Sequence, residues 1–124
     1  MKRIHRRFQA VKGQRVMFST SNAPNIARQA KIIDISMGGL SIGYISMTRS
    51  TEELVELTIL GNDVTLACRS VYDCDLPWKG FDSFTRRCGV EFVNLSKENI
   101  RQVRNIIQFR TIDGPNERNQ IQMN

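Results

Sequence analysis

The sequence alternates between short apolar segments and turn-forming residues, and this pattern is what most limits the folds open to it. Strand-like segments are expected at residues 14–19, 27–35, 39–46, 53–60, 62–73 and 85–93. In the third of these, Leu40, Ile42 and Tyr44 alternate with small residues, as in a strand with one buried face. The turn formers at 61–63 separate two further segments, as in a hairpin.

The residues that follow the last of these segments change to a helical period. Ser96 is a candidate N-cap, and an apolar stripe follows at Ile100, Val103, Ile106 and Ile107. The stripe is expected to pack on the strands, with partner binding as the alternative. Six strands and one helix in 124 residues predict a mainly β domain, a small six-stranded antiparallel β-barrel with a C-terminal α-helix. The expected boundaries are a basic lead-in at 1–13, the barrel with its helix at 14–110, and a frayed tail at 111–124.

Positive charge is concentrated at the beginning of the chain. Eight basic and no acidic residues precede Asp34, whereas residues 34–124 contain ten basic and twelve acidic residues. The net charge of +6 therefore arises entirely from the first quarter of the sequence. Such a local asymmetry predicts an anionic partner, with a solvated basic tail as the alternative.

Several functional classes are disfavoured by what the sequence lacks. No apolar run approaches the roughly 20 residues of a membrane span, and no apolar segment follows the basic start, so we expect a cytoplasmic protein. Three cysteines without CxxC spacing and a single histidine, His5, predict no metal site. Cys68 and Cys88 are expected to be buried as small apolar residues. Without paired carboxylates or a nucleophile near a base, we expect no enzyme.

The most specific feature is a short polar motif between two strands. Residues 34–42 read DISMGGLSI, in which Asp34, Ser36 and Gly39 fit the pattern (D/N)xSxxG. Arginines precede this motif, and the last expected strand, which contains CGVEF from Cys88, follows it. From about Arg3 to Arg110, the chain thereby resembles the PilZ domain family, bacterial receptors for the second messenger cyclic di-GMP. The resemblance implies a PilZ-type barrel that binds this nucleotide and needs no other cofactor.

The family's second motif, RxxxR, can be placed in two registers here. The usual register puts Arg6 in the first position and Ala10 in the second. An intact motif, Arg3 to Arg7, lies three residues earlier, further from Asp34 than the family normally allows. Either the three arginines share the binding in a shifted lead-in, or the domain is a degenerate protein-interaction module that no longer binds nucleotide.

The resemblance implies a set of ligand-binding residues: Arg3, Arg6, Arg7, Asp34, Ser36, Gly38 and Gly39. Guanidinium groups suit cyclic di-GMP because they pair with phosphate, reach guanine in a bidentate fork or stack on the base. Asp34 would accept from a guanine edge or from amides of its own turn. Ser36 would contact the ligand or brace the turn. Gly38 and Gly39 permit a positive φ and close backbone approach.

Secondary candidates lie before and within the last strand. Trp78 could stack on a base or pack its own loop. Arg87 could contact the ligand, although Arg86 and Arg87 also suit a solvated strand end.

The expected function is a non-enzymatic receptor or adapter. It would relay the level of cyclic di-GMP to an unidentified downstream protein, in control of motility, surface attachment or exopolysaccharide, as a monomer or dimer. A less favoured alternative is a basic barrel that binds RNA or single-stranded DNA through exposed aromatics. One Trp, two Tyr and six Phe are available for that role, of which Phe18 and Phe92 are expected to be buried.

Overall fold

The computed structural model describes residues 6–11, 14–45, 53–61, 63–75 and 84–112. Its elements, in chain order, are β1 (Phe8–Gln9), β2 (Arg15–Thr20), β3 (Ala23–Ile35), β4 (Gly39–Tyr44), β5 (Leu54–Ile59), β6 (Val64–Asp75), β7 (Arg86–Phe92) and α1 (Lys97–Phe109). Within these ranges, no helix has the length and apolar character needed to cross a membrane.

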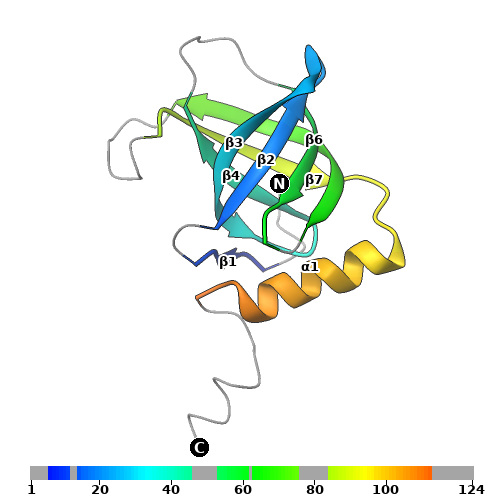
Figure 1. Ribbon diagram of the computed structural model, residues 1–124. Coiled ribbons are helices and arrows are strands. Elements are labelled where there is room, and N and C mark those ends of the chain that lie inside the picture. The colour runs from blue at the N-terminus through cyan, green and yellow to red at the C-terminus, as the bar shows by residue number, and fades with distance from the viewer. Residues whose placement is uncertain (1–5, 12–13, 46–52, 62, 76–83, 113–124) are drawn as a thin grey trace, which may run out of the picture.

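Six of the strands form a closed antiparallel barrel. Their order is β3-β2-β5-β6-β7-β4, and β4 pairs again with β3 to complete the ring. The two-residue strand β1 adds to β3 outside the ring. Helix α1 lies across one end of the barrel, beside β1 (Figure 1). The predicted six-stranded barrel with a C-terminal helix is therefore confirmed, with β1 as an additional strand.

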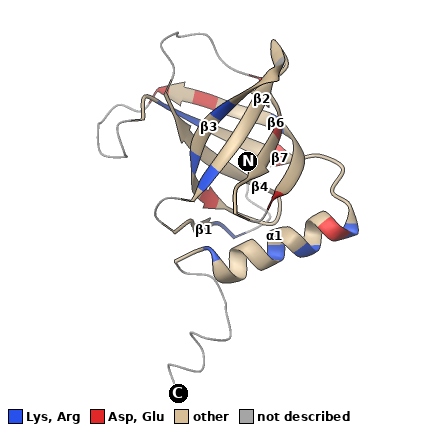
Figure 2. Cartoon of the chain, viewed as in Figure 1, with Lys and Arg blue, Asp and Glu red and all other residues tan. Residues whose placement is uncertain are grey.

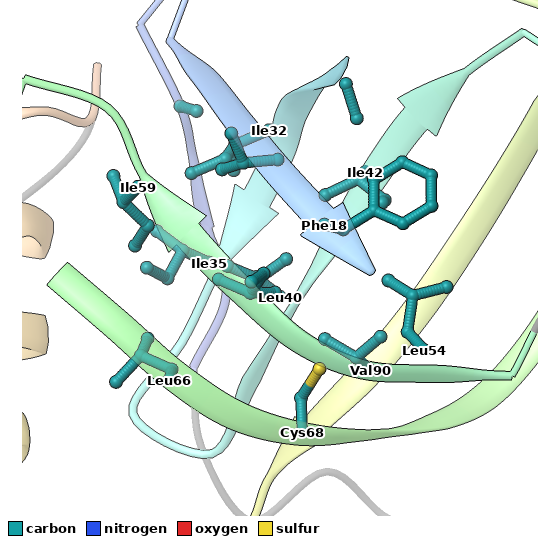
Figure 3. Close-up of a cluster of buried hydrophobic side chains, with 14 of the residues drawn as sticks. Phe18, Ile32, Ile35, Leu40, Ile42, Leu54, Ile59, Leu66, Cys68 and Val90 are labelled. Carbon is teal, nitrogen blue, oxygen red and sulfur yellow. The ribbon is translucent and has the colours of Figure 1, made fainter. Parts of the chain in front are cut away.

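Alternate residues of the strands fill the barrel, as the sequence pattern predicts. Phe18 of β2, Leu40 and Ile42 of β4 and Val90 of β7 are at most 1% exposed and gather in one cluster (Figure 3). The rings of Phe18 and Tyr44 meet edge to face, with 5.3 Å between centroids. Burial of each such side chain contributes about 1.5–3 kcal/mol relative to exposure. The core thus fixes which residues of each strand face outward.

The helix begins and packs as its sequence indicates. The Ser96 side chain accepts a hydrogen bond from the Asn99 amide at 3.0 Å, which confirms Ser96 as the N-cap. Val103, Ile106 and Ile107 are buried in the same apolar cluster as the barrel residues. The apolar stripe therefore packs on the barrel, as expected.

Two strands, β3 and β6, extend beyond the segments expected for them. Residues 20–25, which lie between two expected strands, are reduced to a tight connection, since Thr20 already pairs with Ala23. The strand expected to end at Asp73 ends at Asp75, because β6 continues beside β7 to the end of the DCD sequence. Within the expected tail, Thr111 is buried and pairs with Ala10.

The extension of β6 is stabilised by charged residues that pair with a buried arginine. Arg86 is 5% exposed, so the expectation of a solvated strand end is wrong for it. Its guanidinium donates to Asp73 at 2.8 Å and to Asp75 at 2.6 Å, and the Tyr44 hydroxyl donates to Asp73 at 2.7 Å. Burial, with the Asp73 carboxylate, raises the pKa of Tyr44. Burial alone would lower the pKa of Arg86, but Asp73 outweighs it and the pKa is raised.

Candidate functional site

Four polar side chains from four parts of the chain meet on the outside of the barrel. Arg7 Nη1 and Ser41 Oγ each donate to Asp34 Oδ1 at 2.9 Å. Arg87 Nη2 donates to Asp34 Oδ2 at 2.9 Å and to Ser41 Oγ at 3.2 Å. We call Arg7, Asp34, Ser41 and Arg87 the Asp34 cluster. It brings two guanidinium groups to one carboxylate and therefore carries a net positive charge.

The strand register explains why these residues meet. Asp34 of β3 is opposite Ser41 of β4, and Gly43 of β4 is opposite Arg87 of β7. Leu40, Ile42 and Tyr44 point into the core, so Ser41 and Gly43 face outward. On the other side of Asp34, β1 pairs Gln9 with it and brings the lead-in alongside.

The cluster is partly accessible and has donor capacity left. The side chains of Arg7, Asp34 and Arg87 are 23%, 17% and 32% exposed. Among the buried side-chain nitrogen and oxygen atoms of the described residues, Arg87 Nε has no hydrogen-bond partner. Guanidinium groups that are partly desolvated and carry spare donors bind phosphate and carboxylate oxygens well.

The turn of the DISMGGLSI motif is held by its own hydrogen bonds. The Ser36 amide and hydroxyl both donate to the Gly39 carbonyl, at 2.8 and 3.2 Å, and the Gly38 amide donates to Ser36 Oγ at 3.2 Å. Ser36 is only 4% exposed. Of the two roles considered for Ser36, the contacts in the structure correspond to bracing the turn.

The glycines of this turn serve close packing. Of the two properties that Gly38 and Gly39 permit, a positive φ is not used, since among the described glycines a positive φ occurs at Gly61. A Cβ at Gly39 would lie 2.1 Å from the Val90 carbonyl oxygen. The glycine is therefore needed because β7 passes directly beside it, and the Gly38 carbonyl also accepts from the Phe92 amide.

The other predicted site residues are distributed as follows. Arg6 is exposed, with its guanidinium 4.8 Å from the centroid of the Phe8 ring. Arg3 and Trp78 lie outside the described residues. Arg87, a secondary candidate in the sequence, is a full member of the Asp34 cluster. Ser41 was missed, although its outward position in the alternating strand and its proximity to Asp34 could have indicated it.

The structure places the two candidates for the second position of the RxxxR motif, Ala10 and Arg7, in different surroundings. Ala10 is 7% exposed, and its amide donates to the Ile33 carbonyl at 3.0 Å. An arginine side chain would not fit at this buried position without displacing its neighbours. Arg7, the second residue of the intact motif from Arg3, is the arginine that lies at Asp34.

The groups present at the site decide which kind of ligand it suits. Within the described ranges, no three His, Cys, Asp or Glu residues are grouped so that they could hold a metal ion. The arrangement instead suits an anion with hydrogen-bond donors of its own, which would meet both the arginines and the carboxylate.

Comparisons with known proteins give similar structures but no similar sequences. The sequence matches no protein-family model and no curated protein. The PilZ domain of YcgR from Escherichia coli, solved with cyclic di-GMP, superposes with a TM-score of 0.64 at 15% identity, over 86% of this chain and 89% of that one. A second structure of YcgR in complex with cyclic di-GMP gives a TM-score of 0.60 at 15% identity, over 86% and 45%.

A protein from another bacterium has the same fold. The inhibitor of motility MotI/DgrA from Bacillus subtilis superposes with a TM-score of 0.61 at 16% identity, over 83% of this chain and 48% of that one. The chain thus spans nearly all of the isolated YcgR domain and about half of the two longer proteins.

Proposed function

We propose that this chain, which has the fold of a PilZ domain, is a receptor that binds cyclic di-GMP at the Asp34 cluster. The observation that carries the proposal is the convergence of Arg7 and Arg87 on the two oxygens of Asp34. Its support from similar proteins is that YcgR, with the same fold, is solved in complex with this nucleotide.

The chemistry of the cluster matches that of the ligand. Cyclic di-GMP presents two phosphodiester charges, which guanidinium groups bind through charge-assisted hydrogen bonds. Its guanines present N–H donors, which the Asp34 carboxylate can accept, and O6 and N7, which an arginine fork can reach. On binding, phosphate and guanine groups of the ligand would replace the contacts that Asp34 makes with the two arginines. Arg3 and Arg6 would join from the lead-in.

We further propose that the lead-in passes the binding signal to a downstream protein. The Val11 amide donates to the Arg110 carbonyl at 3.0 Å, so the segment after Arg7 is hydrogen-bonded to the end of helix α1. A ligand that draws Arg7 away from Asp34 would pull on this connection. In this proposal, the protein is a cytoplasmic adapter without catalytic activity. A partner protein that controls motility, attachment or exopolysaccharide would respond to its ligand-bound state.

The deciding experiment is isothermal titration of the purified protein with cyclic di-GMP. GTP and a short oligonucleotide are the controls for nucleotide and nucleic-acid binding. We expect binding of the cyclic dinucleotide alone, and a loss of roughly 10- to 100-fold in Arg7→Gln and Asp34→Asn, since each removes a charged hydrogen bond. Arg104→Gln and Asp63→Asn, at exposed positions away from the cluster, should bind as the unchanged protein does.

A second candidate function is a PilZ-like interaction module without nucleotide. The observation in its favour is that Asp34 is already paired with both arginines within the protein. Absence of heat with cyclic di-GMP would support this candidate and overturn the receptor. Binding of the oligonucleotide that weakens steeply with salt would instead indicate a nucleic-acid-binding barrel.

A further inference from the structure

An aromatic ring lies on the outer face of the barrel beside the Asp34 cluster. A Cβ at Gly43 would be 2.3 Å from Phe84 Cδ2 and 2.9 Å from Cε2, so the ring rests on the backbone of β4. Gly43 is opposite Lys31 on one side and Arg87 on the other. The ring therefore stands next to a member of the cluster.

Phe84 is also one wall of a groove that crosses β3. The groove has a volume of about 450 Å³ and is lined by basic, polar and apolar side chains: Arg15, Arg28, Gln29, Lys31, Ile45 and Phe84. We call it the Phe84 groove. Its charged lining residues are all basic, and β2 and β3 carry basic residues on this part of the barrel (Figure 2). The groove is thus suited to an anionic ligand with a flat apolar part.

The groove and the Asp34 cluster are adjacent. Arg15, Lys31, Gly43 and Arg87 lie opposite one another in a single row across β2, β3, β4 and β7. Neighbouring strands in a sheet are about 4.8 Å apart, so the row from Lys31 to Arg87 spans about 10 Å. A ligand with two similar halves can therefore reach both places at once.

We propose that the Phe84 groove binds the second half of the cyclic dinucleotide, with one guanine stacked on Phe84 and a phosphate at Lys31. This inference rests on the proposed function. The Asp34 cluster contains a single carboxylate acceptor and so can hold one guanine edge. The second half of the ligand therefore needs a binding site outside the cluster. Lys31 Nζ is 5.9 Å from the centroid of the Phe84 ring, so a phosphate bound to it adjoins a base on that ring.

Conservative variants of the groove test the inference. Phe84→Leu keeps an apolar side chain over Gly43 but removes the stacking face, and Lys31→Gln removes the charge. Each should weaken cyclic di-GMP binding about tenfold, as expected when stacking on one base or one phosphate contact is lost. The matched controls Phe109→Leu and Lys97→Gln, at exposed positions on helix α1, should leave the affinity unchanged.

The outcomes separate this inference from the proposed function. If the unchanged protein binds and both groove variants bind as tightly, the second half of the ligand lies elsewhere and only the inference is overturned. If the unchanged protein does not bind, both proposals are overturned. A measurement on the unchanged protein avoids dependence on variant folding, because ring ¹³C–¹H NMR signals of Phe84 should shift on addition of cyclic di-GMP, and a spectrum without that shift contradicts stacking.

Discussion

The backbone amide of Ile112 donates to the carbonyl of Gln9 over 2.9 Å. Arg7, two residues before Gln9, is hydrogen-bonded to Asp34. Arg110, two residues before Ile112, is the C-cap of helix α1. The short strand β1 is therefore held between the barrel and the segment that follows the helix. Because few contacts attach β1, a change at Arg7 should weaken the hydrogen bonds between β1 and the segment at the end of the helix.

Arg7→Gln should loosen this attachment without ligand. A partly exposed ion pair contributes about 1 kcal/mol, so the amides of Val11 and Ile112 should exchange with solvent about fivefold faster. Hydrogen–deuterium exchange followed by NMR measures this directly. Arg104→Gln serves as control, and equal exchange rates in the two variants would show that β1 is held independently of Arg7.

Gly39→Ala should destabilise the fold because the new methyl group would meet backbone. The Cβ would lie 2.1 Å from the Val90 carbonyl oxygen, which cannot move without distorting β7. We expect a loss of about 1–3 kcal/mol in the free energy of unfolding, measured by urea denaturation. Gly61→Asn is the control, since Gly61 has φ of 92° with open space around it, and asparagine tolerates positive φ. A Gly39→Ala protein as stable as this control would mean that β4 and β7 can separate at little cost.

Asp73→Ala should destabilise far more than Asp75→Ala, although both residues pair with Arg86. The Asp73 side chain is 3% exposed and that of Asp75 is 68% exposed. Removing Asp73 leaves a buried guanidinium without its main partner, at about 3–5 kcal/mol, whereas removing an exposed partner costs less than about 1 kcal/mol. Chemical denaturation of the two variants gives the comparison, and equal losses would show that Arg86 is compensated by other groups.

The buried thiols should make the protein less stable at alkaline pH. Burial raises the pKa of Cys68 and of Cys88 from 9.0 to about 12. Because the folded pKa is the higher one, their contribution is fully present below pH 9 and is lost as the pH rises towards 12. At a pH near 10.5, each thiol should lower the free energy of unfolding by about 2 kcal/mol relative to neutral pH.

Denaturation series under reducing conditions at several pH values test this. Cys88→Ala should lose less stability between neutral and alkaline pH than the unchanged protein, even though it begins from a lower value. Cys74→Ala is the control, since Cys74 is exposed. A pH dependence that is the same in all three proteins would assign the alkaline loss to other groups.

The barrel and its helix were predictable because their signals are local. The alternation in β4 and the N-cap at Ser96 each depend on residues that are close together in the sequence. The same local view ended the expected strand at Asp73 and so missed Asp75, since aspartate disfavours strands. Their place in β6 is secured by Arg86, which is brought opposite only when β6 and β7 pair.

The candidate site was predictable only in part, for a similar reason. Asp34 belongs to a short motif, whereas its contact with Arg87 joins residues 53 positions apart. Spacing alone also could not choose between two registers for the lead-in arginines. Burial of Ala10 bears on this choice, and it depends on the assembled barrel and on Thr111 after the helix.

Closure of the six strands has a consequence for how the domain can be recognised. Each strand of the ring has a hydrogen-bonded neighbour on both sides along at least part of its length, and the main-chain donors and acceptors in those parts are already engaged. Edge-to-edge addition of a foreign strand, a common route both to peptide capture and to aggregation, is closed off wherever both neighbours are paired. Recognition by other molecules in those parts of the ring falls to outward side chains and to the segments before and after the ring.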